Sequence, residues 1–243
     1  MKRIIKTRKE IILLKKSAQI TNSCIPLIEK SLSEKNITEK EIARRIREKI
    51  KKQNGTLAFR TIVASGKRSS MIHSKPTVTD EVISGLGYVD FGACYKRYRT
   101  DITVPFIKGK INKKEMKAVK TVFKAYEIAI SSIKIGMPCW KLYQKVDKYM
   151  RKNGYKMMHS LGHGLGLRIH ELPFITMPRK KKLNRKKKKI WEKLKRIKFE
   201  ENMIFTIEPA IYIENSFGCR FENDVLLTKK GLEILTKSKL IRS

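Results

Sequence analysis

Two pairs of carboxylates lie in strand-like segments that are otherwise apolar, and they constrain how this chain can fold. The first pair is Asp90 and Asp101, within VISGLGYVDFGACYKRYRTDITVPFIKG, a pattern that predicts two strands joined by a tight turn. With the turn centred between Tyr95 and Lys96, the two aspartates face each other and point to the same side. Two ionised carboxylates about 5 Å apart among apolar neighbours destabilise a fold unless a cation lies between them.

The second pair repeats this arrangement near the end of the chain. Glu208 and Glu222 are equidistant from Asn215, the middle of the turn expected in MIFTIEPAIYIENSFGCRFENDVLLT. One such pair alone reads as a surface feature, but the chain has 57 Lys and Arg against 22 Asp and Glu, so two pairs are harder to dismiss. One or two divalent cations between the hairpins turn the repulsion into coordination. An oxygen-rich site favours Mn, Fe or Co, with zinc less favoured.

Three of the four histidines lie within HSLGHGLGLRIHELP, residues 159–173. The glycines of this segment argue against a helix. In an extended chain His159 and His163 share a face, and His170 joins them only if the glycines bend the strand. One histidine completes the carboxylate site as a ligand, and another reaches a substrate. A phosphate-binding loop is a poor alternative, because no helix begins here and no nucleotide fingerprint is matched.

The remaining pattern predicts an α+β fold. Helices are expected within residues 1–53, from Asn112 to about Ser131 and from Pro138 to Gly154, with a strand at 56–65. Capping boxes are expected at Thr38 with Glu41 and at Asn112 with Glu115. Helices followed by a hairpin occur near the front of the chain, and a further hairpin near its end, which is weak evidence for two related halves.

Composition narrows the function classes. The net charge of +35 attracts nucleic acid and other polyanions without any specific site. No segment has the roughly 18 consecutive apolar residues of a membrane-spanning helix, and the N-terminus lacks a secretory pattern. The four cysteines form no CxxC pair, which indicates reduced thiols and a cytoplasmic protein; they are Cys24, Cys94, Cys139 and Cys219.

The most basic segment is residues 178–200, with 13 Lys or Arg and two Glu. It predicts a solvated surface insertion with a short helix around Trp191. The alternative is a contact with nucleic acid or ribosomal RNA. Because the rest of the chain is also strongly basic, charge alone does not decide between the two.

At these residues the sequence resembles the pita-bread metallopeptidases, the family of Xaa-Pro dipeptidases (prolidases), Xaa-Pro aminopeptidases and methionine aminopeptidases. The matching stretches occur in the family's order over about residues 56–236; they are VASGKRSSMIHSKPT, VDFGACYKRYRTDIT, GHGLGLRIHELP, FTIEPAIY and GCRFENDVLLT. The resemblance implies a pita-bread fold with two pseudo-symmetric halves, each a set of helices on an antiparallel sheet. We expect one catalytic domain over 1–243, with N-terminal helices in 1–53, the insertion 178–200 and no separate N-terminal domain.

The resemblance also implies a site with two divalent metal ions. Asp90 would bind one ion, His163 and Glu208 the other, and Asp101 and Glu222 would bridge both. A metal-bound hydroxide would be the nucleophile, because two cations lower the pKa of water.

Glu208 would in addition carry a proton. His73 in IHSKP and His170 in HELP match histidines that hydrogen-bond the scissile peptide and stabilise the tetrahedral intermediate. His159 matches no ligand position, and either a substrate-pocket role or a structural one is open for it.

The motifs resemble the Xaa-Pro branch more than the methionine branch, which has an Asn-Val-Cys-His-Gly stretch where SMIHSKP stands here. Three positions depart from the Xaa-Pro pattern: Val104 and Phe174 stand where an Arg is common, and Asn223 replaces an acid. We therefore expect an exopeptidase that removes an N-terminal residue from Xaa-Pro dipeptides or peptides, as a monomer or homodimer. The alternatives are a methionine aminopeptidase and a non-catalytic module that contacts RNA or the ribosome.

Overall fold

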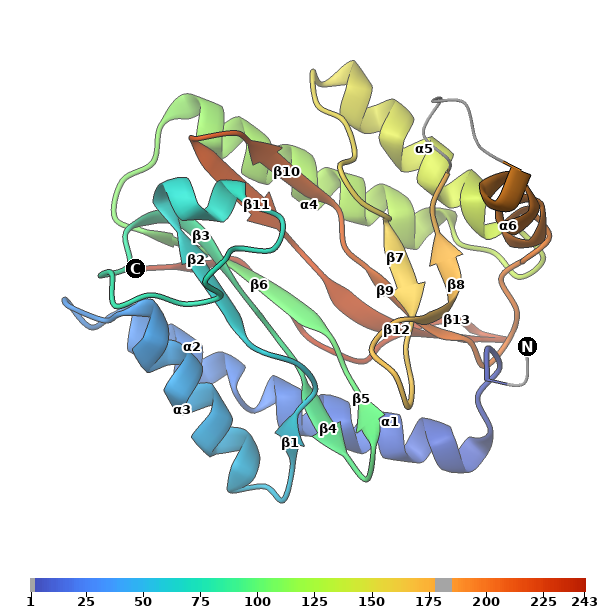
Figure 1. Ribbon diagram of the computed structural model, residues 1–243, viewed down its shortest axis with the longest axis horizontal. Helices are drawn as coiled ribbons and strands as arrows, with labels where there is room; N and C mark the ends of the chain where they lie inside the picture. The colour runs from blue at the N-terminus through green and yellow to red at the C-terminus, as the bar shows by residue number, and fades with distance from the viewer. Residues whose placement is uncertain (1–2, 178–184) are drawn as a thin grey trace.

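The computed structural model describes residues 3–177 and 185–243 and has two halves with the same plan, helices followed by an antiparallel sheet (Figure 1). The predicted α+β class is confirmed. In the N-terminal half the helices are α1 (Arg8–Asn22), α2 (Ile25–Leu32) and α3 (Glu39–Lys51). Its sheet has the order β14-β6-β3-β2, formed by β2 (Ile62–Ser65), β3 (Gly85–Phe91), β6 (Ile102–Lys108) and β14 (Ile241–Arg242). Buried side chains of α2, α3, β3 and β6 form one hydrophobic cluster.

The C-terminal half follows with two long helices, α4 (Lys113–Ser132) and α5 (Cys139–Lys152). Its sheet has the order β13-β12-β9-β7-β8, formed by β7 (Gly162–Gly164), β8 (Glu171–Ile175), β9 (Ile204–Ile207), β12 (Asn223–Thr228) and β13 (Gly231–Ile234). The largest core cluster lies between these helices and this sheet. Within the described residues, no helix is both long and apolar enough to span a membrane.

Smaller elements complete the fold. They are β1 (Thr56–Leu57), the 3-10 helix η1 (Gly66–Ser70), β4 (Ala93–Tyr95), β5 (Tyr98–Arg99), α6 (Arg185–Lys195), β10 (Ala210–Ile213) and β11 (Phe217–Arg220). The predicted helix around Trp191 is confirmed as α6, and residues 178–184 of the predicted insertion lie outside the described residues.

The two sheets meet along the middle of the molecule, where β6 and β12 run side by side (Figure 1). An isolated bridge joins Thr103 of the first half to Glu222 of the second, and the Glu222 backbone N–H donates to the Thr103 carbonyl at 3.2 Å. Residues far apart in the sequence therefore share one central seam.

Helix starts follow the predicted caps in part. The capping box of α4 is complete, because Asn112 accepts from the backbone of Glu115 while the Glu115 side chain accepts from the Asn112 backbone. A second complete box at Thr7 and Glu10 starts α1 and was not predicted. It sets the first helical residue at Arg8 rather than nearer the N-terminus.

The capping box predicted for α3 is only half present. Thr38 accepts from the backbone N–H of Glu41 at 3.2 Å, as expected. The Glu41 carboxylate does not return the bond, because Arg44 and Arg45 each donate to it at 2.7 Å. Charged neighbours one turn later thus compete successfully with the cap.

The predicted strand at 56–65 is wrong in its middle. Its start, β1, pairs with β4, and its end, β2, pairs with β3 in a different sheet. The chain crosses between the sheets at residues 58–61, where the Ala58 N–H donates to the Gly92 carbonyl at 2.8 Å. An alternating pattern does not reveal that one extended segment serves two sheets.

The predicted register of the first hairpin is also wrong, by two residues. Asp90 stands opposite Thr103, not Asp101, because the turn centres on Lys96 and Arg97. These two residues have φ of 47° and 74°, as a tight two-residue hairpin turn requires. A shift of two residues keeps side chains on the same face, so the expected closeness of the two aspartates survives.

The register of the second hairpin is confirmed. Ile213 pairs with Phe217 in β10 and β11, and Ile207 pairs with Asn223 in β9 and β12, so both pairings are symmetric about Asn215. Asn215 itself has φ of 56°, a conformation that Asn tolerates in turns. Glu208 and Glu222 therefore emerge at matching positions beside the seam.

Glycine is required where β7 approaches β9. A Cβ added at Gly162 would lie 1.9 Å from the backbone oxygen of Thr206. We predict that Gly162→Ala lowers the free energy of unfolding by at least about 3 kcal/mol. The control is Gly154→Ala at the end of α5, where φ is 86° and no described atom lies within 4 Å, so only the strain of about 1–2 kcal/mol applies. Chemical denaturation measures both, and equal losses would contradict this packing.

Candidate metal centre

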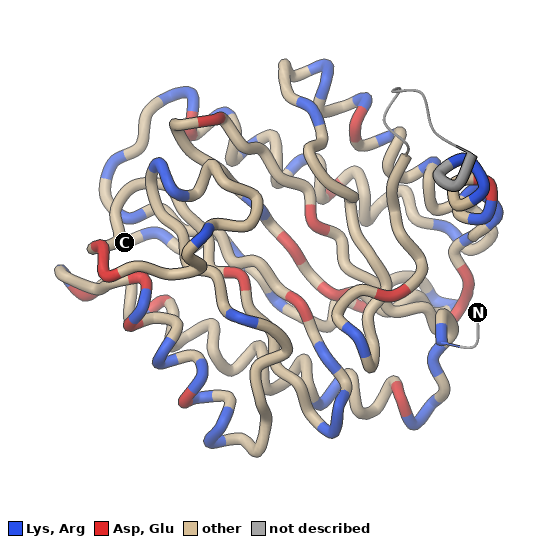
Figure 2. Tube along the Cα trace, in the orientation of Figure 1, with Lys and Arg blue, Asp and Glu red and all other residues tan. Residues whose placement is uncertain are grey.

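All eight residues singled out by the sequence line one cavity of about 270 Å³ between the two halves. The set comprises every histidine of the chain and the four paired carboxylates: His73, Asp90, Asp101, His159, His163, His170, Glu208 and Glu222. Figure 2 shows acidic residues gathered along the central strands, while Lys and Arg lie mainly on the outer helices and loops. The site therefore differs in charge from the rest of the molecule.

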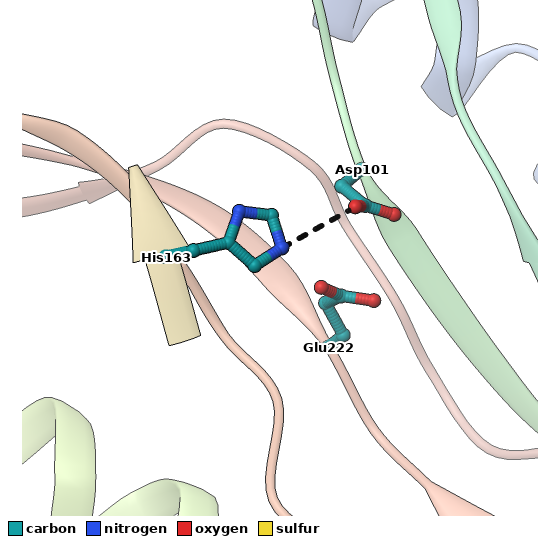
Figure 3. Close-up of side chains that lie close together, drawn as sticks. All are labelled: Asp101, His163 and Glu222. Carbon is teal, nitrogen blue, oxygen red and sulfur yellow. Dashed lines mark ion pairs between the residues drawn. The ribbon is translucent and has the colours of Figure 1, made fainter. Parts of the chain in front are cut away.

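Three of these side chains converge on one point (Figure 3). One ligand atom each from Asp101, His163 and Glu222 lies within 4.8 Å of the other two, and all three residues are buried. Asp101 directly precedes β6, His163 is the middle residue of β7, and Glu222 directly precedes β12. Each half of the fold thus contributes to the cluster.

The imidazole of His163 is oriented for ligation. Its Nδ1 lies 3.1 Å from the carbonyl oxygen of Gly164, which places the proton on Nδ1 and leaves the Nε2 lone pair facing the cavity. Nε2 lies 3.7 Å from both Asp101 Oδ2 and Glu208 Oε1. Burial lowers the pKa of His163 to about 3, so the ring is neutral at neutral pH.

The carboxylates of the cluster are buried close to one another. Burial, and then the neighbouring Asp90, raise the pKa of Glu222 to about 7. Burial and Glu222 raise the pKa of Asp101 well above its ordinary value. Glu222 Oε2 accepts from the Thr103 hydroxyl at 2.6 Å, and Glu208, whose pKa is raised by burial and Glu222, lies 3.5 Å from His159 Nδ1.

Unpartnered oxygens show that the site fits a cation. Within the described parts of the chain, Oδ1 of Asp90 and Oδ1 of Asp101 are buried without a hydrogen-bond partner. Buried polar atoms nearly always have partners, and a bound cation would supply one to both oxygens. Four carboxylates and one neutral imidazole match the hard, oxygen-rich donor set of divalent Mn, Fe or Co.

Asp90 differs from the other carboxylates because it already has a cationic partner. The guanidinium of Arg220 forms a buried ion pair with its Oδ2, stacks 4.5 Å from the ring centroid of Tyr88 and donates to Thr103 Oγ1 at 2.9 Å. Sequence reasoning missed Arg220. Its signal was a single basic residue between the apolar positions of the strand that leads to Glu222.

The histidine-rich segment 159–173 bends, as was required for His170 to lie on the same side as His163. The rings of His163 and His170 lie with centroids 4.3 Å apart, because residues 165–170 turn back between β7 and β8. A Cβ at Gly164 would lie 2.1 Å from the Leu172 carbonyl oxygen, so only glycine permits this return. His159 binds Tyr212 instead, with Nε2 3.2 Å from the phenolic oxygen.

Fold and site together define a metallohydrolase of two sheets with its ligands at their junction. Residues 13–229 match metallopeptidase family M24. The chain is 34% identical to the Xaa-Pro dipeptidase of Pyrococcus furiosus, over 98% of this chain and 64% of the relative. It is 36% identical to an uncharacterised peptidase of Methanocaldococcus jannaschii, over 98% of this chain and 65% of the relative.

Solved structures agree with this match. The X-Pro aminopeptidase of Thermotoga maritima superposes with a TM-score of 0.86 at 32% identity, covering 100% of this chain and 65% of that one. The prolidase of Pyrococcus furiosus superposes with a TM-score of 0.83 at 32% identity, covering 98% of this chain and 66% of that one.

This chain belongs to metallopeptidase family M24. The pita-bread fold expected from its motifs is confirmed. Membership implies a divalent-metal cofactor, and the cluster at Asp101 could bind one. The chain spans 64–65% of the length of these curated relatives.

The raised pKa values predict how metal binding depends on pH. The fold raises the pKa of Glu222 from an ordinary 4.5 to about 7. Between these two pH values the metal-free folded protein binds more protons than the unfolded chain, so its free energy of unfolding falls as the pH rises. Mn²⁺ must displace these protons, so it raises the melting temperature more at about pH 7.5 than at about pH 5. Thermal melts with and without Mn²⁺ measure this, and a shift independent of pH would contradict it.

Proposed function

We propose that this protein is a metal-dependent exopeptidase that removes the residue preceding proline at the N-terminus of a peptide or dipeptide. The observation that carries the proposal is the convergence of Asp101, His163 and Glu222 in a cavity ringed by histidines, in a chain of family M24. The preference for proline is supported by relatives named Xaa-Pro dipeptidase and X-Pro aminopeptidase.

Five side chains would hold two metal ions. Asp90 would bind one ion, His163 and Glu208 the other, and Asp101 and Glu222 would lie between them. When bound, the ions polarise the scissile carbonyl and acidify water. The chain contributes fixed geometry, since Thr103 orients Glu222 and the Gly164 carbonyl orients the ring of His163.

The remaining polar residues handle protons and the substrate. Glu208 lies at the cavity wall beside His163 and would move a proton from water to the leaving amine. His170 and His73 reach the cavity from separate loops and would hydrogen-bond the scissile peptide. His159, held by the Ser160 carbonyl at 2.7 Å and the Tyr212 hydroxyl at 3.2 Å, would form part of the cavity wall beside Glu208.

Apolar side chains also line the cavity; they include Phe59, Ile62, Ile72 and Phe174. They would exclude water from the scissile bond and give a proline ring an apolar surface. Phe174 stands at the position where an Arg is common in the Xaa-Pro pattern, so this position supplies no cation to bind the substrate.

The direct test combines a peptide panel with the Asp101→Ala variant. With Mn²⁺ or Co²⁺, the protein is expected to cleave Met-Pro or Ala-Pro peptides, and Asp101→Ala to lose more than about 100-fold in kcat/KM together with metal uptake, because a ligand is removed. Glu214→Ala, an exposed acid at the hairpin turn, is the control. Cleavage of Met-Ala-Ser alone would support a methionine aminopeptidase, and normal turnover by Asp101→Ala would refute the site.

The surface of α6 supports a second role in binding polyanions. The ring of Trp191 packs edge-on against Trp140 of α5, with centroids 6.5 Å apart, which fixes the helix on the body of the protein. Its exposed basic side chains include Lys188, Lys189, Lys193 and Lys195. Exposed cations along one helix suit the phosphates of single-stranded RNA.

Replacing these four lysines with Gln tests this role. We expect weaker RNA binding and a log–log salt slope that is less steep by up to about 3, while kcat/KM is unchanged. The control replaces four other exposed lysines, Lys35, Lys49, Lys51 and Lys52, which changes the net charge equally. Equal effects from both sets, measured by fluorescence anisotropy, would mean that only the overall charge of the protein attracts RNA.

A further inference from the structure

A second hollow adjoins the metal centre. It has a volume of about 780 Å³ and lies between α3 and residues 57–61 and 77–80, and Phe59 lines both it and the cavity of the metal centre. In Figure 1 α3 runs alongside the segment that links β1 and β2. We call this hollow the α3 groove. The metal-centre cavity and the α3 groove therefore adjoin at Phe59.

The α3 groove is cationic, unlike the cavity next to it. Its lining has four cations and two carboxylates: Lys40, Arg44, Arg47, Arg60, Glu41 and Asp80. Lys40 pairs with Asp80, and Arg44 pairs with Glu41. Arg47 and Arg60 are exposed, and neither has a carboxylate oxygen within 4 Å among the described residues. Two guanidinium groups are thus available to bind a ligand anion.

A buried hydroxyl adds an independent sign of a ligand. Thr61 lines the groove with 4% of its surface exposed, and its Oγ1 has no hydrogen-bond partner in the described structure. A buried hydroxyl without a partner costs free energy that a bound polar group recovers. Thr61 also directly precedes β2, whose first residue Ile62 lines the metal-centre cavity, so the groove and the cavity lie close together along the chain.

The metal-centre cavity offers a substrate carboxylate no free basic side chain. Among its lining residues Arg220 is the sole Lys or Arg, and it already binds Asp90 and Tyr212. A carboxylate that extends past the proline of a longer peptide therefore finds free guanidinium groups in the adjoining α3 groove.

We propose that the α3 groove binds the C-terminal part of the substrate, with Arg60 and Arg47 binding a carboxylate two or three residues beyond the proline. This inference rests on the proposed peptidase function. The carboxylate is either the C-terminus of a short peptide or the side chain of Asp or Glu in a longer one. A bidentate guanidinium suits either group.

Chain length bounds the peptide required. Ile62 lines the metal-centre cavity, and Arg60 lies two residues earlier in the chain. Two residues span at most about 7 Å, so the Arg60 backbone lies within this distance of Ile62, and two or three further peptide residues can reach it. Dipeptides are too short, and the groove therefore favours peptides of about five residues.

The test compares Ala-Pro-Ala-Ala-Ala as the free acid with its C-terminal amide. With Mn²⁺ we expect the acid to have about tenfold higher kcat/KM, mainly through KM, because about 1.4 kcal/mol of charge-assisted binding is lost in the amide. The double variant Arg60→Gln/Arg47→Gln should bring the two peptides to equality while cleavage of Ala-Pro is unchanged. Arg8→Gln is the control, since Arg8 is exposed and has no carboxylate partner in the parts of the chain described.

Calorimetric titration of the metal-free protein with both pentapeptides separates the two proposals. Tighter binding of the acid, lost in Arg60→Gln/Arg47→Gln, supports the groove even if no peptide is cleaved, a result that would defeat only the peptidase function. Equal binding and equal kcat/KM for acid and amide in the unaltered protein would overturn the groove. So would an acid preference that the double variant retains.

Discussion

Mutual repulsion among carboxylates buried at the seam between the two sheets is the constraint on which this structure depends. Asp90, Asp101 and Glu222 are each less than 10% exposed, and Asp224 beside them is fully buried. Arg220 neutralises one of these charges. The others require protons or cations, because charges taken out of water need a partner. The fold is arranged so that a metal ion can supply what the side chains lack.

This arrangement joins the stability of the fold to the chemistry of the site. Asp101 comes from the first half, and His163 and Glu222 come from the second, so neither half holds the cluster alone. Thr103 crosses the seam to bind both Glu222 and Arg220. A metal ion bound at the cluster would therefore stabilise the contact between the halves as well as prepare the reaction. The close approach of β7 to β9, which only glycine allows, serves the same end by bringing His163 to the carboxylates.

Much of the site could be predicted because the acids interrupt apolar strands in symmetric pairs. The second hairpin followed its symmetry about Asn215. The first hairpin did not follow its predicted register, because its turn lies at Lys96 and Arg97, which adopt left-handed conformations. Asn or Gly at these positions would have indicated such a turn, whereas Lys and Arg do not. The isolated position of Arg220 among apolar residues was a signal, but its partner could not be predicted, since the fold alone brings Asp90 to it across the seam. The sequence showed which charged residues interrupt apolar strands, and the fold showed which of them contact one another.

The measurement that bears most directly on this account is anomalous diffraction at the manganese edge from crystals grown with Mn²⁺. The account predicts two peaks in the cavity, both within coordination distance of Asp101 and Glu222, with His163 bound to one of them. Crystals replete in metal that show no peak between these oxygens, or whose carboxylates separate onto different surfaces, would contradict it.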